Sequence, residues 1–100
     1  MSNETPFVIH RHVKGGTPHF DLMIRRHDAL ATWSFPRMPG DAEVAGARLS
    51  DHRLRYLTFE GDIGRGKGAT AIVERGVCDV THWSDDRIEV VFHGATLAGR

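Results

Sequence analysis

Short runs of alternating apolar and polar residues, separated by turn residues, run through almost the whole sequence. The runs are rich in β-branched and aromatic residues, and Gly, Pro and Asp lie between them. They cover residues 6–12, 19–26, 30–36, 70–83 and 87–94. No segment keeps a helical period over ten residues. The pattern therefore predicts an all-β fold, a small, mostly antiparallel β-barrel of about seven to nine short strands with little helix.

Two segments need a more specific prediction. Residues 48–61 could be a strand or a weak helix, and the Tyr, Thr and Phe late in this segment favour a strand over 54–60. Residues 70–76 and 77–83 are two β-rich runs on either side of Gly76. We therefore expect these two runs to form a hairpin that turns at Gly76.

Length and charge limit the classes of function. The 100 residues predict one domain over 1–100, with a flexible N-terminus at 1–6. Lys plus Arg is 13 and Asp plus Glu is 13, so the formal charge is zero. This excludes broad coating of nucleic acid or of an anionic membrane by net charge, but it allows a local basic site.

Cys78 is the one cysteine, so an intrachain disulfide is excluded, and we interpret it as a small buried hydrophobe. The N-terminal residues lack a secretory signal, and no apolar run has the length of a membrane span. The sequence therefore predicts a cytoplasmic protein with no membrane partner.

His12, His19 and Asp21 are the first candidate site residues. His19 and Asp21 are two positions apart, so in a strand they share a face, while Phe20 and Leu22 occupy the other. If the preceding strand pairs with this one, His12 joins them. Two imidazoles and a carboxylate can hold a divalent metal with open positions for water and substrate. The spacing alone equally allows three polar residues on a solvated strand face.

His52, Tyr56 and Arg37 are the second group of candidates. A His and a Tyr on one wall of a cavity can contact a phosphate or transfer a proton, and Arg37 can bind an anion. Each also has a simpler interpretation, as a loop histidine, a tyrosine at the edge of the core and a solvated loop cation. The remaining histidines have no partner in the sequence pattern; they are His10, His27, His82 and His93.

A glycine-rich basic segment at residues 64–68 is the last feature of interest. It lacks the Gly-Lys-Ser/Thr ending of a nucleotide-binding P-loop and a following helix. We interpret it as a basic loop that contacts a nucleic-acid backbone.

Several motifs in order resemble the 3′-phosphoesterase domain of bacterial DNA ligase D and its stand-alone relatives. They are "FVIHRHVKGGTPHFDLM" at 7–23, "TWSFPR" at 32–37, "SDHRLRYLTFEG" at 50–61 and "GRGKGATAIVERG" at 64–76. The resemblance implies that His12, His19 and Asp21 hold a metal. It also implies that Arg37 and His52 bind the substrate phosphate and that His52 and Tyr56 are catalytic.

The resemblance further implies a Mn²⁺-dependent enzyme, with Zn²⁺ or Co²⁺ as other candidate metals. Such an enzyme removes a 3′-phosphate or a 3′-terminal ribonucleoside from DNA in repair and leaves a 3′-hydroxyl. The implied partners are DNA 3′ ends of a primer-template and a separate DNA ligase or polymerase, and we expect a monomer. Met23 stands where the ligase-linked pattern has an arginine and Phe20 where it has a tyrosine, so we expect reduced or altered activity.

Two alternatives stay open. The first is a non-catalytic module that binds DNA ends or a repair partner and carries a vestigial metal site. The second is an iron oxygenase with two histidines and one carboxylate, because "HFD" at 19–21 with a later His93 has that ligand order. The length of the chain argues against the oxygenase, which needs a larger barrel.

Overall fold

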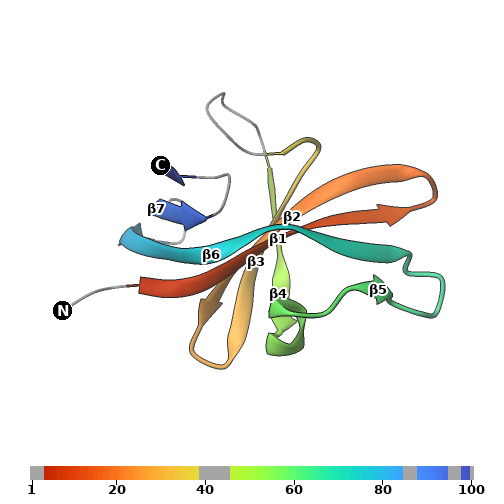
Figure 1. Ribbon diagram of the computed structural model, residues 1–100, viewed down its shortest axis with the longest axis horizontal. Coiled ribbons are helices and arrows are strands. Elements are labelled where there is room, and N and C mark those ends of the chain that lie inside the picture. Colours follow the sequence, from red (N-terminus) through yellow and green to blue (C-terminus); the bar gives the residue numbers. More distant parts are fainter. Residues whose placement is uncertain (1–3, 39–45, 85–87, 95–97, 100) are drawn as a thin grey trace.

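The structure is a computed structural model that describes residues 4–38, 46–84, 88–94 and 98–99. One curled antiparallel sheet has the order β4-β3-β2-β1-β6-β7-β8, and β5 pairs with β6 off this path (Figure 1). The elements are β1 (Glu4–Lys14), β2 (Thr17–Arg26), β3 (Ala29–Phe35), β4 (Ala47–Arg53), the 3-10 helix η1 (Leu54–Leu57), β5 (Gly61–Asp62), β6 (Ala69–Trp83), β7 (Ile88–Gly94) and β8 (Ala98–Gly99). The predicted all-β, barrel-like fold is confirmed as an open half-barrel.

The N-terminal end of the chain joins the sheet early. Residues 1–3 of the N-terminus predicted to be flexible lie outside the described residues, and β1 already begins at Glu4. At 11 residues β1 is longer than the predicted run at 6–12. It pairs with β2 on one side and with β6 on the other, so it is the central strand of the sheet.

A two-residue turn sets how β1 meets β2. Gly15 and Gly16 have φ values of +67° and +86°. A hairpin turn of type I′ needs positive φ at both central positions, and glycine adopts these values without steric cost. The resulting register places His12 directly opposite His19. The pairing on which the sequence-based metal hypothesis depends is therefore confirmed.

The two faces of the β1–β2 hairpin pack against different groups of residues, because successive side chains of a strand alternate between faces. One face forms the main core, whose buried members are Phe7, Ile9, Leu22, Ile24, Cys78, Val90 and Phe92. The other face carries a smaller cluster of Val8, Met23 and Leu30, which side chains of η1 cover. This second face also carries the polar candidates of the sequence, next to an apolar patch rather than in open solvent.

The predicted hairpin at Gly76 is wrong. Residues Ala69–Trp83 form one strand of 15 residues, β6, in which Gly76 lies opposite Phe7 of β1. Since β1 offers hydrogen-bond partners along its whole length, both halves of β6 satisfy their backbone without a turn. The pairing of β6 with β1 contains a shift of register between Ile9 and His10, and no turn.

The predicted strand over 54–60 is also wrong, because Leu54–Leu57 form the 3-10 helix η1 and no strand follows before β5 at Gly61. In a strand, Tyr56 and Leu57 would point to opposite faces. The tight turn lets Leu54, Tyr56 and Leu57 all pack against the cluster of Val8 and Met23. Within the part of the chain that the structure describes, no helix has the length and apolar character needed to cross a membrane.

Cys78 provides a direct test of the core. Its side chain is fully buried, and this burial, with a smaller contribution from Asp79, raises the pKa of the thiol to about 11. We expect a disulfide reagent at pH 8 to leave the native thiol unlabelled, and to label one thiol per chain in guanidinium chloride, because the thiolate is the reactive form. Rapid stoichiometric labelling without denaturant would contradict the packing of β6 against β1.

Candidate active site

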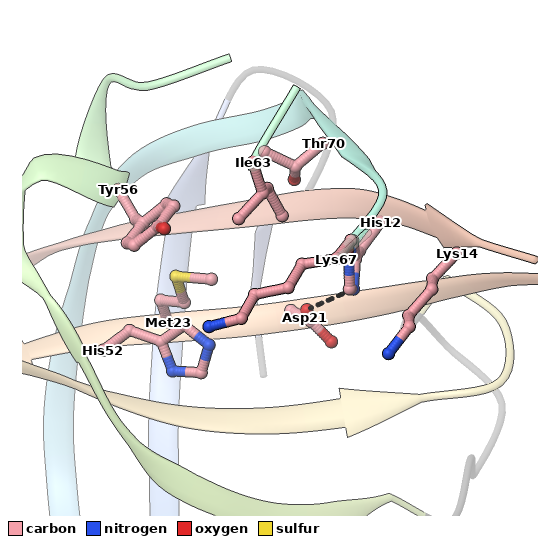
Figure 2. Close-up of a pocket in the computed structure, with 9 residues that line it drawn as sticks. All are labelled: His12, Lys14, Asp21, Met23, His52, Tyr56, Ile63, Lys67 and Thr70. Carbon is pink, nitrogen blue, oxygen red and sulfur yellow. Dashed lines mark hydrogen bonds and ion pairs between the residues drawn. The ribbon is translucent and has the colours of Figure 1, made fainter. Parts of the chain in front are cut away.

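An open cleft of about 410 Å³ lies on the face of the sheet that carries Met23. Its walls are the β1–β2 hairpin, the end of β4 with η1, and the loop from β5 to β6 (Figure 2). The residues that line it are His12, Lys14, Asp21, Met23, His52, Tyr56, Ile63, Lys67 and Thr70. Four residues singled out in the sequence, His12, Asp21, His52 and Tyr56, therefore come together from three separate segments.

His12 and Asp21 are diagonal neighbours across the β1–β2 pair. His12 lies opposite His19, and Asp21 is two residues further along the same face of β2. His12 Nδ1 is 3.8 Å from Asp21 Oδ2, which is the contact drawn as a dashed line in Figure 2. The other ring nitrogen of His12, Nε2, is 2.7 Å from the carbonyl oxygen of Lys67.

These contacts leave hydrogen-bond acceptors without donors. Because a carbonyl oxygen can only accept, His12 Nε2 must carry the hydrogen, and in the neutral ring Nδ1 then presents a lone pair toward the Asp21 carboxylate. Asp21 is only 5% exposed, and its Oδ1 has no hydrogen-bond partner. Buried polar atoms rarely lack a partner. A cation between His12 and Asp21 would satisfy these groups, so the two residues fit a divalent metal ion.

His19 stands further from this arrangement. It pairs with His12 in the sheet, but its side chain is exposed and is not part of the cleft lining. The ligand atoms of His12, His19 and Asp21 do not all come within 4.8 Å of one another. An exposed imidazole can change its χ1 rotamer at low cost. His12 and Asp21 are thus placed for a metal as they stand, and His19 would join them by a side-chain rotation.

A different group of ligand-type side chains lies at the opposite end of β1. Within the described ranges, Glu4, Asp79 and His93 are the one group of three whose ligand atoms lie within 4.8 Å of one another. His93 Nε2 is 3.1 Å from Asp79 Oδ2, so His93 has a partner that the sequence did not reveal. Roughly 26 Å of extended strand separates Glu4 from His12. This position of His93 contradicts an iron triad with His19 and Asp21.

His52 and Tyr56 form the wall opposite the hairpin. Their ring centroids are 5.9 Å apart at an interplanar angle of 77°, an edge-to-face contact. His52 Nδ1 is 3.0 Å from the carbonyl oxygen of Ser50 and must donate to it, so Nε2 is left for a ligand. The sequence paired these residues as alternate positions of one strand. The structure pairs them across the end of β4 and η1.

Arg37 is not part of the cleft. It follows β3, which ends at Phe35, and its side chain is exposed. It is absent from the residues that line the cleft. Its role in phosphate binding stays a prediction that the cleft geometry does not support.

His10 is a structural member of the site that the sequence analysis missed. It is fully buried, its Nε2 is 2.6 Å from the carbonyl oxygen of Tyr56, and its Nδ1 is 2.6 Å from the hydroxyl of Thr70. The carbonyl accepts from Nε2–H, so Nδ1 accepts from the Thr70 hydroxyl, and the neutral ring is fully satisfied. His10 therefore ties η1 to β6 beneath the cleft. Its position two residues before His12, on the same strand face, was the available signal.

The burial of His10 predicts a pH dependence of stability. Burial lowers the pKa of His10 below its ordinary value of 6.5, and His52 adds a smaller lowering effect. The hydrogen bond to the Tyr56 carbonyl and the charges of Asp21 and Glu60 raise the pKa, but they do not offset the effect of burial. Below pH 6.5 the unfolded chain takes up a proton that the folded chain does not. Stability should then fall with decreasing pH, by at most about 1.4 kcal/mol per pH unit from this group, until the pH reaches the lowered folded pKa.

Urea unfolding between pH 8 and pH 5 tests this, with His10→Gln as the comparison. Glutamine keeps one donor and one acceptor but cannot titrate, so the difference in slope between the two proteins isolates His10 from the other histidines. Identical slopes for both proteins would contradict the buried neutral ring.

Two lysines, one isoleucine and one threonine complete the lining of the cleft, and no sequence motif had marked them as site residues. Lys14 comes from the end of β1, Lys67 and Ile63 from the loop between β5 and β6, and Thr70 from the start of β6. The glycine-rich segment at 64–68 stands out in the sequence, where we interpret it as a loop that contacts a nucleic-acid backbone and not as part of a cleft. Of this segment, the structure places Lys67 in the cleft wall.

Comparison with known proteins agrees with the geometry. A sequence model of the DNA ligase D 3′-phosphoesterase domain matches residues 9–100. The chain belongs to this family. All the candidate residues of the cleft lie inside the matched range. Membership of the DNA ligase D 3′-phosphoesterase family links the chain to DNA-end processing in repair.

Individual relatives give the same result. The chain is 33% identical over 104 residues to the "Multifunctional non-homologous end joining protein LigD" of Mycobacterium bovis. It is 33% and 32% identical to the "Multifunctional non-homologous end joining DNA repair protein LigD" of two Mycobacterium tuberculosis strains. Each match covers 94% of this chain but 14% of the relative. The chain therefore corresponds to one small part of these multifunctional proteins.

Proposed function

We propose that this protein is a metal-dependent phosphoesterase that acts on DNA 3′ ends, removing a 3′-phosphate or a 3′-terminal ribonucleoside to leave a 3′-hydroxyl. The observation that carries the proposal is the buried Asp21 carboxylate, whose Oδ1 has no partner and whose Oδ2 faces His12 inside a cleft. Family membership supports the reaction class and a DNA substrate. A 3′-hydroxyl is what a ligase or polymerase requires, so a separate enzyme of that kind is the proposed partner.

His12 and Asp21, with His19 after a change of rotamer, would hold the metal. A divalent ion there, with Mn²⁺ proposed from the family and Zn²⁺ or Co²⁺ as alternatives, would polarise a phosphoryl oxygen or activate a water molecule. Burial of Asp21 and the hydrogen bond from His12 to the Lys67 carbonyl keep both ligands in place before the metal binds.

His52 and Tyr56 would act on the substrate itself. His52 is oriented by its bond to the Ser50 carbonyl, and when its ring is protonated the remaining Nε2–H would donate to a phosphoryl oxygen. The edge contact with His52 and the bond from His10 to the Tyr56 carbonyl hold Tyr56 in position. Preorganised donors of this kind stabilise the charge that develops on the phosphoryl group in the transition state.

The test is turnover of two primer-templates, one with a 3′-phosphate and one with a 3′-terminal ribonucleotide, with and without Mn²⁺. We expect metal-dependent product from at least one of them and a large loss in His19→Ala. His27→Asn is the matched control, because His27 lies in the β2–β3 turn outside the cleft and its φ of 57° suits asparagine. If no product forms on either DNA, the proposal is wrong.

Two observations favour a non-catalytic DNA-end binding module as the second candidate. The cleft floor at Met23 is apolar and 3% exposed, and His19 is exposed and is not among the residues that line the cleft. Fluorescence anisotropy with the same two DNAs separates the candidates. Binding that survives His19→Ala, without any metal-dependent product from the wild type, would establish the binding module.

A further inference from the structure

The cleft contains a source of positive charge that neither the sequence motifs nor the family membership assigns. Its lining includes Lys14 and Lys67, both exposed. Figure 2 shows the Lys67 side chain running across the cleft, with its ammonium group toward the side where Met23 and His52 lie. Lys14 is on the other side of Asp21 in the same view. Within the described ranges, neither ammonium group forms an ion pair.

The loop that carries Lys67 is held against β1 by its backbone. The Lys67 carbonyl accepts from His12 Nε2 at 2.7 Å, and the Ile63 amide donates to the Gly68 carbonyl at 2.9 Å. The Lys67 amide donates to the Gly64 carbonyl, also at 2.9 Å. These bonds fix where the Lys67 side chain starts and leave its ammonium group free to meet a ligand.

Without a bound metal ion, the floor of the cleft offers an anion no hydrogen-bond donor. Met23 is buried and apolar, and the oxygens of the Asp21 side chain beside it are acceptors. An anion that enters the metal-free cleft must therefore be held from the walls. The donors available above Met23 are the Lys67 ammonium and, when the His52 ring is protonated, the Nε2–H that the Ser50 carbonyl does not use. A lysine ammonium is a compact charge with three donors that suits a phosphate oxygen.

We propose that Lys67 and His52 form a phosphate subsite above Met23, which binds the phosphate group at the DNA 3′ end. The identity of the ligand as a DNA 3′ end rests on the proposed function. The inference that the subsite binds a phosphate group does not. The glycine-rich segment then serves as a wall of the active site: its Lys67 supplies the charge that the floor lacks. Arg65, in the same loop, is exposed and outside the cleft lining.

The direct test measures binding of inorganic phosphate to the full chain by isothermal titration calorimetry at low salt. We expect Lys67→Ala to weaken binding about fivefold to tenfold, as for a charge-assisted bond partly open to solvent. Lys67→Arg should retain most of the affinity. Arg65→Ala removes the same charge from the same loop and should leave the affinity within about twofold of the wild type. Equal losses in Lys67→Ala and Arg65→Ala would show a non-specific charge effect and overturn the subsite.

Turnover of the 3′-phosphate primer-template separates this inference from the proposed function. If the subsite is right, Lys67→Ala raises KM for this DNA and weakens inhibition by phosphate by similar factors. Turnover with unchanged KM and unchanged phosphate inhibition in Lys67→Ala would refute the subsite and leave the enzyme intact. Phosphate binding that depends on Lys67, without turnover of any DNA end, would refute the enzyme and leave the subsite. Thermal melting of each variant confirms folding, which an exposed lysine should not affect.

Discussion

Asp21→Asn is expected to lower metal-dependent turnover by at least ~100-fold, since loss of even an outer partner of a metal ligand costs 10- to 100-fold. Asparagine keeps the size of the side chain but loses the negative charge that would hold the metal. The buried Oδ1 that now lacks a partner and the contact of Oδ2 with His12 place this charge at the centre of the cleft. The measurements are turnover of both primer-templates and Mn²⁺ binding followed by electron paramagnetic resonance.

Asp28→Asn is the matched control for this experiment. Asp28 lies in the turn between β2 and β3, is exposed and does not line the cleft. It should behave as the wild type in both measurements. Thermal melting without metal will show that Asp21→Asn is folded, as expected for a substitution of equal size. Full activity and unchanged Mn²⁺ binding in Asp21→Asn would exclude a metal at this position.

Gly68→Ala is expected to destabilise the protein by about 2–4 kcal/mol and to displace the loop that carries Lys67. Gly68 has a φ of +86°, and a Cβ placed there would lie 2.0 Å from the Val13 carbonyl oxygen. The clash is with backbone in the central strand, so the neighbour cannot move aside. Relief would require the loop to leave β1 and lose the bond between His12 and the Lys67 carbonyl.

Gly66→Ala separates the cost of a positive φ from the cost of the Cβ clash. Gly66 also has positive φ, +69°, but a Cβ there would have no atom within 4 Å. We expect it to cost about 1 kcal/mol, the ordinary penalty for alanine in the left-handed region. Urea unfolding of the two variants and their affinity for inorganic phosphate provide the comparison. If Gly68→Ala is no less stable than Gly66→Ala, the loop does not pack against Val13 as described.

The predictions that succeeded depend on local chemistry. Alternation placed His19 and Asp21 on one strand face, and the condition set for His12 to join them, pairing of the two strands, is met across the tight turn at Gly15 and Gly16. These features involve residues close together in sequence. Their geometry depends on backbone sterics and strand periodicity, which the amino-acid types reveal directly.

The predictions that failed involve partners distant in sequence. Gly76 looks like a turn residue, but the length of β1 opposite it allows β6 to continue. Leu54–Leu57 contain strand-forming residues, yet packing on Val8 and Met23 favours a 3-10 turn. His10 has no local partner, and its bonds reach 46 and 60 residues away to Tyr56 and Thr70. The secondary-structure propensity of a residue predicts its conformation poorly where a contact with a residue distant in sequence favours another conformation.

The sequence by itself determined the all-β class, the β1–β2 hairpin and the family to which the chain belongs. The tertiary structure alone decided which residues share the cleft, because that depends on how far the sheet curls and on where the β5–β6 loop meets β1. It brought Lys67 to the cleft and left Arg37 outside it. Both are cations beside glycine or proline in the sequence, and the close approach of the Gly68 backbone to Val13 is what holds the Lys67 loop beside the cleft.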